Sequence, residues 1–225
     1  MTEVPAGPLI QALEQRRLSF ISLKTSASAL IVRKGRKRSF ESIALLLKGQ
    51  EKFKLEAYDP LGQPLVTLLW KGKSAALLRA GQLSVIESGK GLEQLVGAEV
   101  KPGELGALLS GNVPAISGVS ESKAYCGQDG GCVLDMHSGK ERRLVRVIPG
   151  AEIRVLSSEL YREGTPVFRV RFSHFETISH YALPRMIVVE NSDRKNSLTV
   201  ELGDPEVNTP LDDGEFTASG MENVE

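Results

Sequence analysis

The feature that most constrains the fold is an alternation of apolar and polar side chains, interrupted at short intervals by turns that contain Gly or Pro. The segment EKFKLEAY (51–58) shows it most clearly, because its charged side chains fall on one face of an extended chain and its apolar side chains on the other. The apolar set is Phe53, Leu55 and Ala57. From Phe20 onward, turn signals recur at intervals of about 8–12 residues, as in chains of hairpins. The sequence therefore predicts a mainly β protein built on an antiparallel sheet.

Two segments depart from this pattern and show helical spacing. Residues 8–18 begin with Pro8 and place apolar side chains three or four positions apart, which predicts a short amphipathic helix. Residues 91–111 carry two leucine-rich groups at the same spacing, the second of which has Pro102 near its start and Gly111 just after its end. We expect two short helices here, inserted between two halves of the sheet.

The strand patterns add up to a sheet of roughly ten strands, and a sheet that large tends to curl or split. If it curls with its apolar face inward and helices across its mouth, it encloses a ligand cavity. We expect a single domain over residues 1–217 and a flexible acidic tail over residues 218–225. The acidic, Gly- and Ser-containing composition already begins at about Asp212, where we expect the chain to fray.

The charge balance argues against a nucleic-acid-binding surface. The 225 residues include 28 Lys and Arg and 28 Asp and Glu, and only 5% are aromatic. No apolar run approaches the roughly 18 residues of a membrane-spanning helix. The first residues also lack the basic and apolar regions of a secretory signal. Two locations stay open: the cytosol, or an oxidising space reached by a protein whose targeting segment has been removed.

The only two cysteines, Cys126 and Cys132, flank five turn-forming residues. If the flanking segments are paired strands, the two sulfur atoms can meet across the hairpin. A disulfide at this place would favour the periplasm or another oxidising space. Two free thiols are the main alternative. A metal site is disfavoured, because no second Cys/His pair has a matching spacing.

Catalytic motifs are missing from the sequence, including those of serine hydrolases, zinc proteases and phosphate-binding loops. His174, Glu176 and His180 lie close together in sequence, but surface polar residues explain them as well. An enzyme would need these three groups to converge in a cleft. We therefore expect a protein that is not an enzyme and that uses no metal or cofactor.

A basic run, RKGRKR (33–38), has two interpretations. It could bind phosphate or the anionic headgroups of lipids. It could equally be a solvated hairpin tip whose charges protect a sheet edge from pairing with another chain.

Three stretches of the chain follow one another in a familiar order and spacing. They are DPLGQPLVTLLW (59–70), LEQLVGAEVKPGELGALLSGNVP (92–114) and LPRMIVVEN…NSLTVELGDPEVNTPLDDGEFT (183–217). In the last stretch the strands lead to an Asn, a short acidic turn and a Phe, represented here by Asn208, Leu211, Asp212 and Phe216. Together the stretches resemble the LolA/LolB superfamily of lipoprotein-localisation proteins, and they are most similar to its LolB-like outer-membrane lipoprotein branch. The resemblance covers roughly residues 8–217.

The resemblance implies a half-open antiparallel β-barrel of about eleven strands, with short helices that form a lid over an apolar cavity for acyl chains. It also implies a periplasmic location and attachment to the outer membrane through an N-terminal lipidated Cys that this sequence does not contain. Leu61 matches the exposed turn leucine that contacts the membrane in this family. The alternative for Leu61 is that it packs back on the sheet or on a neighbouring loop.

We thus expect a non-enzymatic periplasmic protein that holds acyl chains and serves lipoprotein localisation at the outer membrane. Its expected partners are acyl chains of lipoproteins or lipids, the outer-membrane surface and a periplasmic carrier protein, and not nucleic acid. The alternative is a structural or interaction module of a cell-envelope assembly, with the same fold and a filled core. The residues predicted to line the cavity are Phe53, Leu55, Ala57, Leu69, Leu92, Leu95, Val96, Leu105, Leu108 and Phe172.

Overall fold

The computed structural model describes residues 1–50, 52–72, 74–79, 81–86, 100, 102–114 and 118–217. The first group of elements is β1 (Thr2–Val4), α1 (Gly7–Ser19), β2 (Ser22–Arg33), β3 (Arg36–Lys48), β4 (Lys52–Tyr58), β5 (Pro64–Lys71), β6 (Ser74–Arg79), β7 (Gln82–Ile86) and α3 (Pro102–Leu109). The second group is β8 (Glu121–Cys126), β9 (Cys132–Ser138), β10 (Glu141–Ile148), β11 (Arg154–Arg162), β12 (Thr165–Ile178), β13 (Tyr181–Asn191), β14 (Asn196–Leu202), β15 (Glu206–Val207) and the 3₁₀ helix η1 (Asp213–Phe216).

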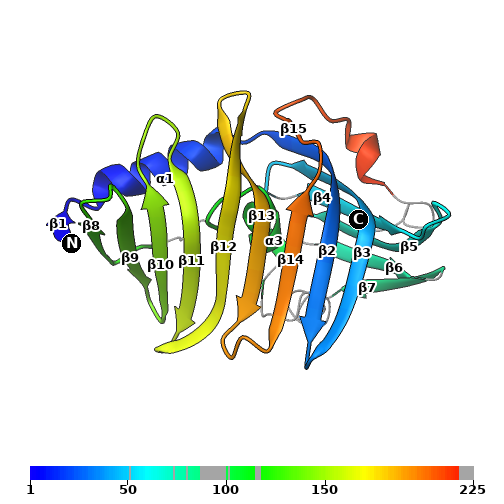
Figure 1. The fold of residues 1–225 in the computed structure, drawn as a ribbon, viewed down its shortest axis with the longest axis horizontal. Coiled ribbons are helices and arrows are strands. Elements are labelled where there is room, and N and C mark those ends of the chain that lie inside the picture. Colours follow the sequence, from blue (N-terminus) through cyan, green and yellow to red (C-terminus); the bar gives the residue numbers. More distant parts are fainter. Residues whose placement is uncertain are drawn as a thin grey trace.

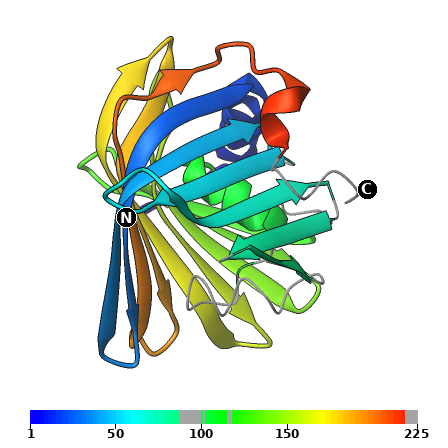
Figure 2. The same cartoon turned by 90° about the vertical axis from the view of Figure 1, so that its right-hand side faces the viewer.

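All the strands belong to one antiparallel sheet, which curves strongly but does not close (Figures 1 and 2). The strand order is β1-β8-β9-β10-β11-β12-β13-β14-β2-β3-β4-β5-β6-β7, and β15 pairs with the start of β2. Over the described residues, the end strands β1 and β7 do not pair with each other. The prediction of a mainly β, half-open antiparallel architecture is confirmed.

The sheet has fifteen strands in the described residues, more than the roughly ten or eleven expected from the sequence and the resemblance. The excess comes partly from very short strands. β1 has 3 residues and β15 has 2, which is too few for an alternating pattern to be recognised. Of the three predicted helices, those at 8–18 and near Pro102 are present as α1 and α3, and the one around Leu92–Val96 lies outside the described residues.

Two hairpin series form the sheet, and they join where β14 pairs with β2. One series runs from β2 to β7 and the other from β8 to β14, so strands from near the two ends of the chain meet at the centre of the sheet. Figure 2 shows α3 inside the curve of the sheet. No helix in the described part of the chain has the length and apolar character needed to span a bilayer.

α1 runs across one end of strands β9 to β12 (Figure 1), and Arg16 holds it in place. The buried guanidinium donates hydrogen bonds to three backbone carbonyls, those of Ile153 (3.3 Å), Gly111 (3.2 Å) and Ala182 (2.8 Å). These carbonyls belong to three separate segments of the chain, so one side chain ties the helix to all of them. The guanidinium also lies 4.3 Å from the ring centroid of Tyr181.

The outer face of the sheet carries a second, smaller apolar cluster under η1. Phe216 is 1% exposed there, and it packs with Leu211, Leu69 and Ala76. Lys48 Nζ donates to the Leu211 carbonyl oxygen (2.8 Å) and contacts the Asp213 carboxylate (2.7 Å). The expectation that the chain frays from about Asp212 is therefore wrong for residues 212–217, because burial of Phe216 holds this segment on the sheet. Residues 218–225, the predicted tail, lie outside the described residues.

Candidate functional site

A cavity of about 880 Å³ lies between α3 and the concave face of one half of the sheet. Six neighbouring strands, β14 and β2 to β6, contribute to its wall. The apolar lining residues are Ala27, Ala29, Ile31, Phe40, Ile43, Leu45, Leu55, Ala57, Val66, Leu68, Leu77, Leu105, Leu109, Leu198 and Val200.

The strand alternation explains why this wall is apolar. On β2 the inward positions are every second residue, Ala27, Ala29 and Ile31. Their partners on β3 are Ile43, Phe40 and Arg38, and the first two extend the apolar surface across the pair. Small alanines on β2 and β4 leave space that larger side chains would fill, so the cavity follows directly from the residue sizes at inward positions.

Of the residues predicted to line the cavity, Leu55, Ala57 and Leu105 do so. Phe53, Leu108 and Phe172 are instead buried in the adjoining packed core. Leu92, Leu95 and Val96 lie outside the described residues. The ligand-binding roles of all these residues stay predictions.

The prediction for Leu69 is corrected by the geometry. Leu69 follows Leu68 on β5, and successive side chains of a strand point to opposite faces. Leu68 lines the cavity, whereas Leu69 packs in the outer cluster with Ala76, Leu211 and Phe216.

Two contacts hold α3 in the curve of the sheet. Gly106 lies so close to the turn before β4 that a Cβ atom at this position would be 2.8 Å from the backbone oxygen of Gln50. On the other side, Arg143 Nη2 of β10 donates to the Glu104 carboxylate at 3.0 Å. Burial lowers the pKa of Arg143, and the Glu104 carboxylate opposes that shift. The helix is thus fixed to both halves of the sheet.

A group of cations completes the cavity wall at its rim, a placement that the sequence analysis did not predict. Arg33, Lys34, Arg36, Lys37 and Arg38 come from the β2–β3 hairpin, and Arg79 comes from the end of β6. We call these six residues the basic rim. A signal was available in the sequence: the alternation that points Ala29 and Ile31 inward also points Arg33 inward.

The turn between β4 and β5 holds Leu61 in solvent. The Asp59 carboxylate accepts hydrogen bonds from the backbone N–H groups of Leu61 and Gln63, both at 2.8 Å. Gly62 has a φ of +79° and donates its N–H to the Asp59 carbonyl (3.0 Å). Leu61 is 86% exposed, so it does not pack back on the sheet or on a neighbouring loop.

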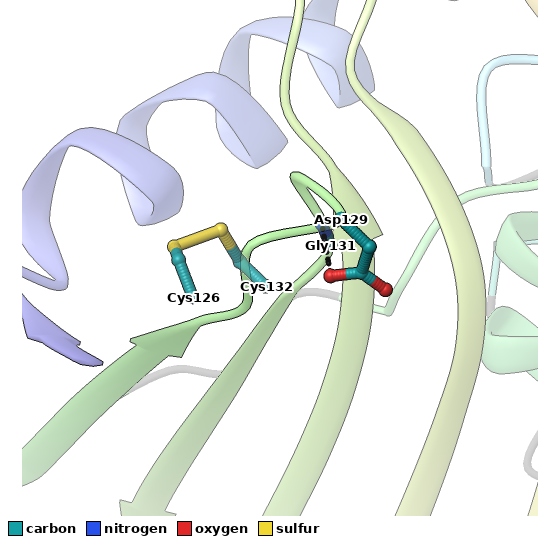
Figure 3. Close-up of a disulfide and its surroundings, with 4 residues drawn as sticks. All are labelled: Cys126, Asp129, Gly131 and Cys132. Atoms are coloured by element: carbon teal, nitrogen blue, oxygen red, sulfur yellow. Dashed lines mark hydrogen bonds between the residues drawn. A yellow bond between two sulfur atoms is a disulfide. The ribbon is translucent and has the colours of Figure 1, made fainter. Parts of the chain in front are cut away.

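The predicted disulfide between Cys126 and Cys132 is present (Figure 3). The two residues are cross-strand partners at the ends of β8 and β9, with their Cα atoms 4.1 Å apart. In the intervening turn, the Asp129 carboxylate accepts a hydrogen bond from the Gly131 N–H at 3.2 Å. The bridge therefore closes the hairpin at its tip.

The structure does not join His174, Glu176 and His180 into a reactive site. All three are exposed on β12 and its following turn, and Glu176 is ion-paired with Arg185. Among the described residues, no group of three or more His, Cys, Asp or Glu could hold a metal ion.

Comparison with solved structures places this geometry in a known fold. A LolA superfamily protein from Nitrosomonas europaea superposes with a TM-score of 0.62 over 96% of this chain and 99% of that one, at 15% sequence identity. The chain has the LolA-superfamily fold. The resemblance inferred from the sequence is confirmed at that level.

Two further solved structures are similar to this chain in fold. A putative outer membrane lipoprotein-sorting protein domain from Vibrio parahaemolyticus has a TM-score of 0.62, with 11% identity over 95% of this chain and 97% of that one. A DUF1329 family protein from Desulfovibrio piger has a TM-score of 0.67, with 13% identity over 97% and 99%. No protein-family model matches the sequence, and no curated protein matches it either.

Proposed function

We propose that this protein binds acyl chains of a lipid or lipoprotein in its apolar cavity and makes or breaks no covalent bond. The observation that carries the proposal is a largely apolar wall around about 880 Å³ of space, within a LolA-superfamily fold. That volume lies in the range of about 300–1,000 Å³ usual for ligand pockets. Burial of the chain's methylene groups would supply the affinity, at about 0.8 kcal/mol each.

The cavity also favours this proposal over the alternative of an interaction module. A filled core would offer no space for a chain. Here the packed core extends along both halves of the sheet, and beside it the half around β2 to β6 keeps open space below α3.

We further propose that the protein works in the periplasm at the outer membrane, as a LolB-like receptor or donor of lipidated cargo. Two observations support this. The Cys126–Cys132 disulfide is typical of an oxidising compartment. Leu61, held in water by its turn, is suited to insert into the edge of a bilayer and would touch the outer-membrane surface.

Native mass spectrometry of the purified protein, followed by extraction of bound lipid, tests the binding proposal. We expect a bound species that contains acyl chains, together with uptake of an uncharged fluorescent probe such as a pyrene-labelled monoacylglycerol. Leu55→Asp puts a carboxylate on the cavity wall and should abolish uptake, because a charge beside the chain opposes its burial. Leu83→Asp, at an exposed leucine that does not line the cavity, is the matched control and should bind normally. An apo mass together with no probe uptake would contradict the proposal and favour the interaction module.

A further inference from the structure

The β2–β3 hairpin changes from apolar to basic along one face. Its cross-strand pairs are Ala27 with Ile43, Ala29 with Phe40, Ile31 with Arg38 and Arg33 with Arg36, in order toward the tip. All eight side chains line the cavity. The arginines therefore continue the concave wall itself and do not project from the outer face of the hairpin.

The basic rim reaches the cavity from two walls. Arg79, at the end of β6, lines the same cavity as the hairpin although three strands separate β6 from β2. This placement differs from that of a solvated hairpin tip, whose charges would only have to face water.

Charge complementarity at the rim favours an anion. Six of the residues that line the cavity are cationic and, within the described part of the chain, none is acidic. Arg36, Lys37 and Arg79 have no carboxylate of a described residue within ion-pair distance. Glu41, the acid nearest to the hairpin in sequence, does not line the cavity. Asp193, in the turn before the β14 residue that pairs with Arg33, does not line it either, and it accepts a hydrogen bond from the Lys195 N–H (2.9 Å). Like charges gathered at the edge of an apolar wall repel one another, and a bound anion relieves that repulsion.

The boundary between the two parts of the wall is marked by Arg38. Its guanidinium lies 4.8 Å from the ring centroid of Phe40, so the charge rests on the last aromatic side chain of the apolar surface. The planar guanidinium group can donate two parallel hydrogen bonds to a phosphate. A ligand that matches this sequence of surfaces has acyl chains at one end and a phosphate at the other.

We propose that the basic rim is a headgroup site and that the ligand is an acyl lipid with an anionic phosphate headgroup. This inference rests on the proposed function, which supplies the acyl-chain cavity, and it adds the chemical class of the ligand. The chains lie along Ala29, Ile31 and Phe40, and the phosphate is held by Arg36 and Arg38 with Arg79 facing them.

Binding of short-chain amphiphiles, kept monomeric below their micelle-forming concentration, tests the headgroup site by calorimetry. Dihexanoyl phosphatidic acid and uncharged dihexanoylglycerol share their chains and differ in the phosphate. We expect the phosphate-bearing lipid to bind at least about tenfold more tightly, since charge-assisted hydrogen bonds add to chain burial. This preference should shrink as salt is raised.

Arg36→Glu/Arg38→Glu should remove the preference and leave dihexanoylglycerol binding within about twofold. Lys71→Glu/Arg146→Glu makes the same change in net charge at exposed positions that do not line the cavity, and it should keep the preference. Because all four positions are exposed, the folded state should survive. If the glutamate variant does not fold, Arg36→Gln/Arg38→Gln gives the same comparison without reversing the charge.

The alternative outcomes overturn the inference in distinguishable ways. Equal affinity for both lipids would exclude the headgroup site and remain consistent with the acyl-chain cavity. If neither lipid binds, the proposed function itself is contradicted. Inorganic phosphate that binds as tightly as the lipid would identify a site for free phosphate. Loss of binding to phosphatidylglycerol vesicles in the Arg36→Glu/Arg38→Glu variant, with unchanged binding of monomeric lipid, would make the hairpin a membrane-docking surface.

Discussion

Leu61 owes its exposure to hydrogen bonds made by its neighbours. The Asp59 carboxylate and the left-handed Gly62 fix the turn without using the leucine side chain. The Leu61 side chain is therefore available to insert into a bilayer. Its full transfer out of water would contribute about 1.5–3 kcal/mol to the free energy of membrane binding.

Replacing Leu61 by Glu should leave the free energy of unfolding unchanged within about 0.5 kcal/mol, as for most exposed sites. It should abolish contact with lipid vesicles, which co-sedimentation measures, and lipid transfer to them. Leu83→Glu, at a second exposed leucine, is the control and should behave like the unchanged protein. Vesicle binding that survives in Leu61→Glu would exclude the membrane role of this residue.

Arg16 and Tyr181 form a buried polar unit where α1 crosses the sheet. The Tyr181 hydroxyl donates to the Ser110 carbonyl oxygen at 2.8 Å, and the ring packs against Phe20 with centroids 5.5 Å apart. Burial raises the pKa of Tyr181 to about 12, while the nearby Arg16 charge opposes the shift.

This shift predicts a loss of stability in alkali. The phenol ionises at a pH of about 10 in the unfolded chain and at about 12 in the folded one, so between these values the unfolded state binds fewer protons. The contribution of Tyr181 is therefore complete below pH 10 and falls as the pH rises toward 12. Denaturant titrations at several pH values should show a shallower alkaline decline for Tyr181→Phe. The same slope in both proteins would contradict the shift.

Strands β4 and β5 show where the sequence pattern is sufficient to orient side chains and where it fails. On β4 the charged and apolar residues alternate, and Leu55 and Ala57 face the cavity as predicted. On β5 both Leu68 and Leu69 are apolar, because η1 covers the outer face. Alternation cannot orient a strand that is buried on both faces. The burial of η1 could not be predicted from the sequence, because the stretch that forms η1 is acidic and has the composition of a frayed tail.

The attachment of α3 to the sheet depends on the ion pair between Arg143 and Glu104. Arg143 is buried, so Glu104→Gln should deprive its charge of the carboxylate to which it is hydrogen-bonded and cost about 3 kcal/mol or more. Glu163→Gln removes the partner of Lys140 in an exposed pair that does not involve Arg143 and should cost less than about 1 kcal/mol. Urea denaturation of the two variants measures the contrast. Equal losses would show that burial of Arg143 does not govern the energy of the pair.

The Cys126–Cys132 bridge stabilises the β8–β9 hairpin. It closes a loop with a sequence separation of 6, and loop entropy predicts a contribution of about 2 kcal/mol. Cys126→Ser/Cys132→Ser should lower the free energy of unfolding by that amount. A reducing agent should destabilise the unchanged protein and leave the double variant unaffected. The absence of any difference between oxidised and reduced protein would mean that the hairpin is held by its strand pairing alone.

The two halves of the sheet should differ in rigidity. Around β9 to β12 the inward residues are fully buried, including Val145, Val155 and Val170. Around β2 to β6 several of them, such as the half-buried Leu55 and Leu77, border open space and so lack packing partners on that side. Local opening is easiest where packing contacts are few.

Hydrogen–deuterium exchange should therefore be faster in β4 to β6 than in β10 to β12. Addition of an uncharged monoacylglycerol should slow exchange in β2 to β6 and leave β10 to β12 unchanged, which act as an internal reference. Uniform protection across both halves would indicate that the ligand does not occupy the cavity.

The fold class and the hairpin series could be predicted from the sequence, because alternation and turns are local signals. It could not show that the basic run at 33–38 joins an apolar wall, since that depends on the pairing of β2 with β3 and on the position of β6 across the cavity. The small inward residues Ala27, Ala29 and Ala57 had the right alternation, but empty space is a property of the assembled sheet.

The pairing of β14 with β2 has a consequence for how the chain is made. Asn208 donates to the Ser19 carbonyl across 189 positions of sequence, and the centre of the sheet forms only when the two ends of the chain meet. Such long-range pairing makes folding slow. Until the last third of the polypeptide has emerged, β2 is an unpaired edge, rich in apolar and β-branched residues, and open to pairing with other nascent chains. The chain would therefore benefit from a chaperone that shields β2 during synthesis.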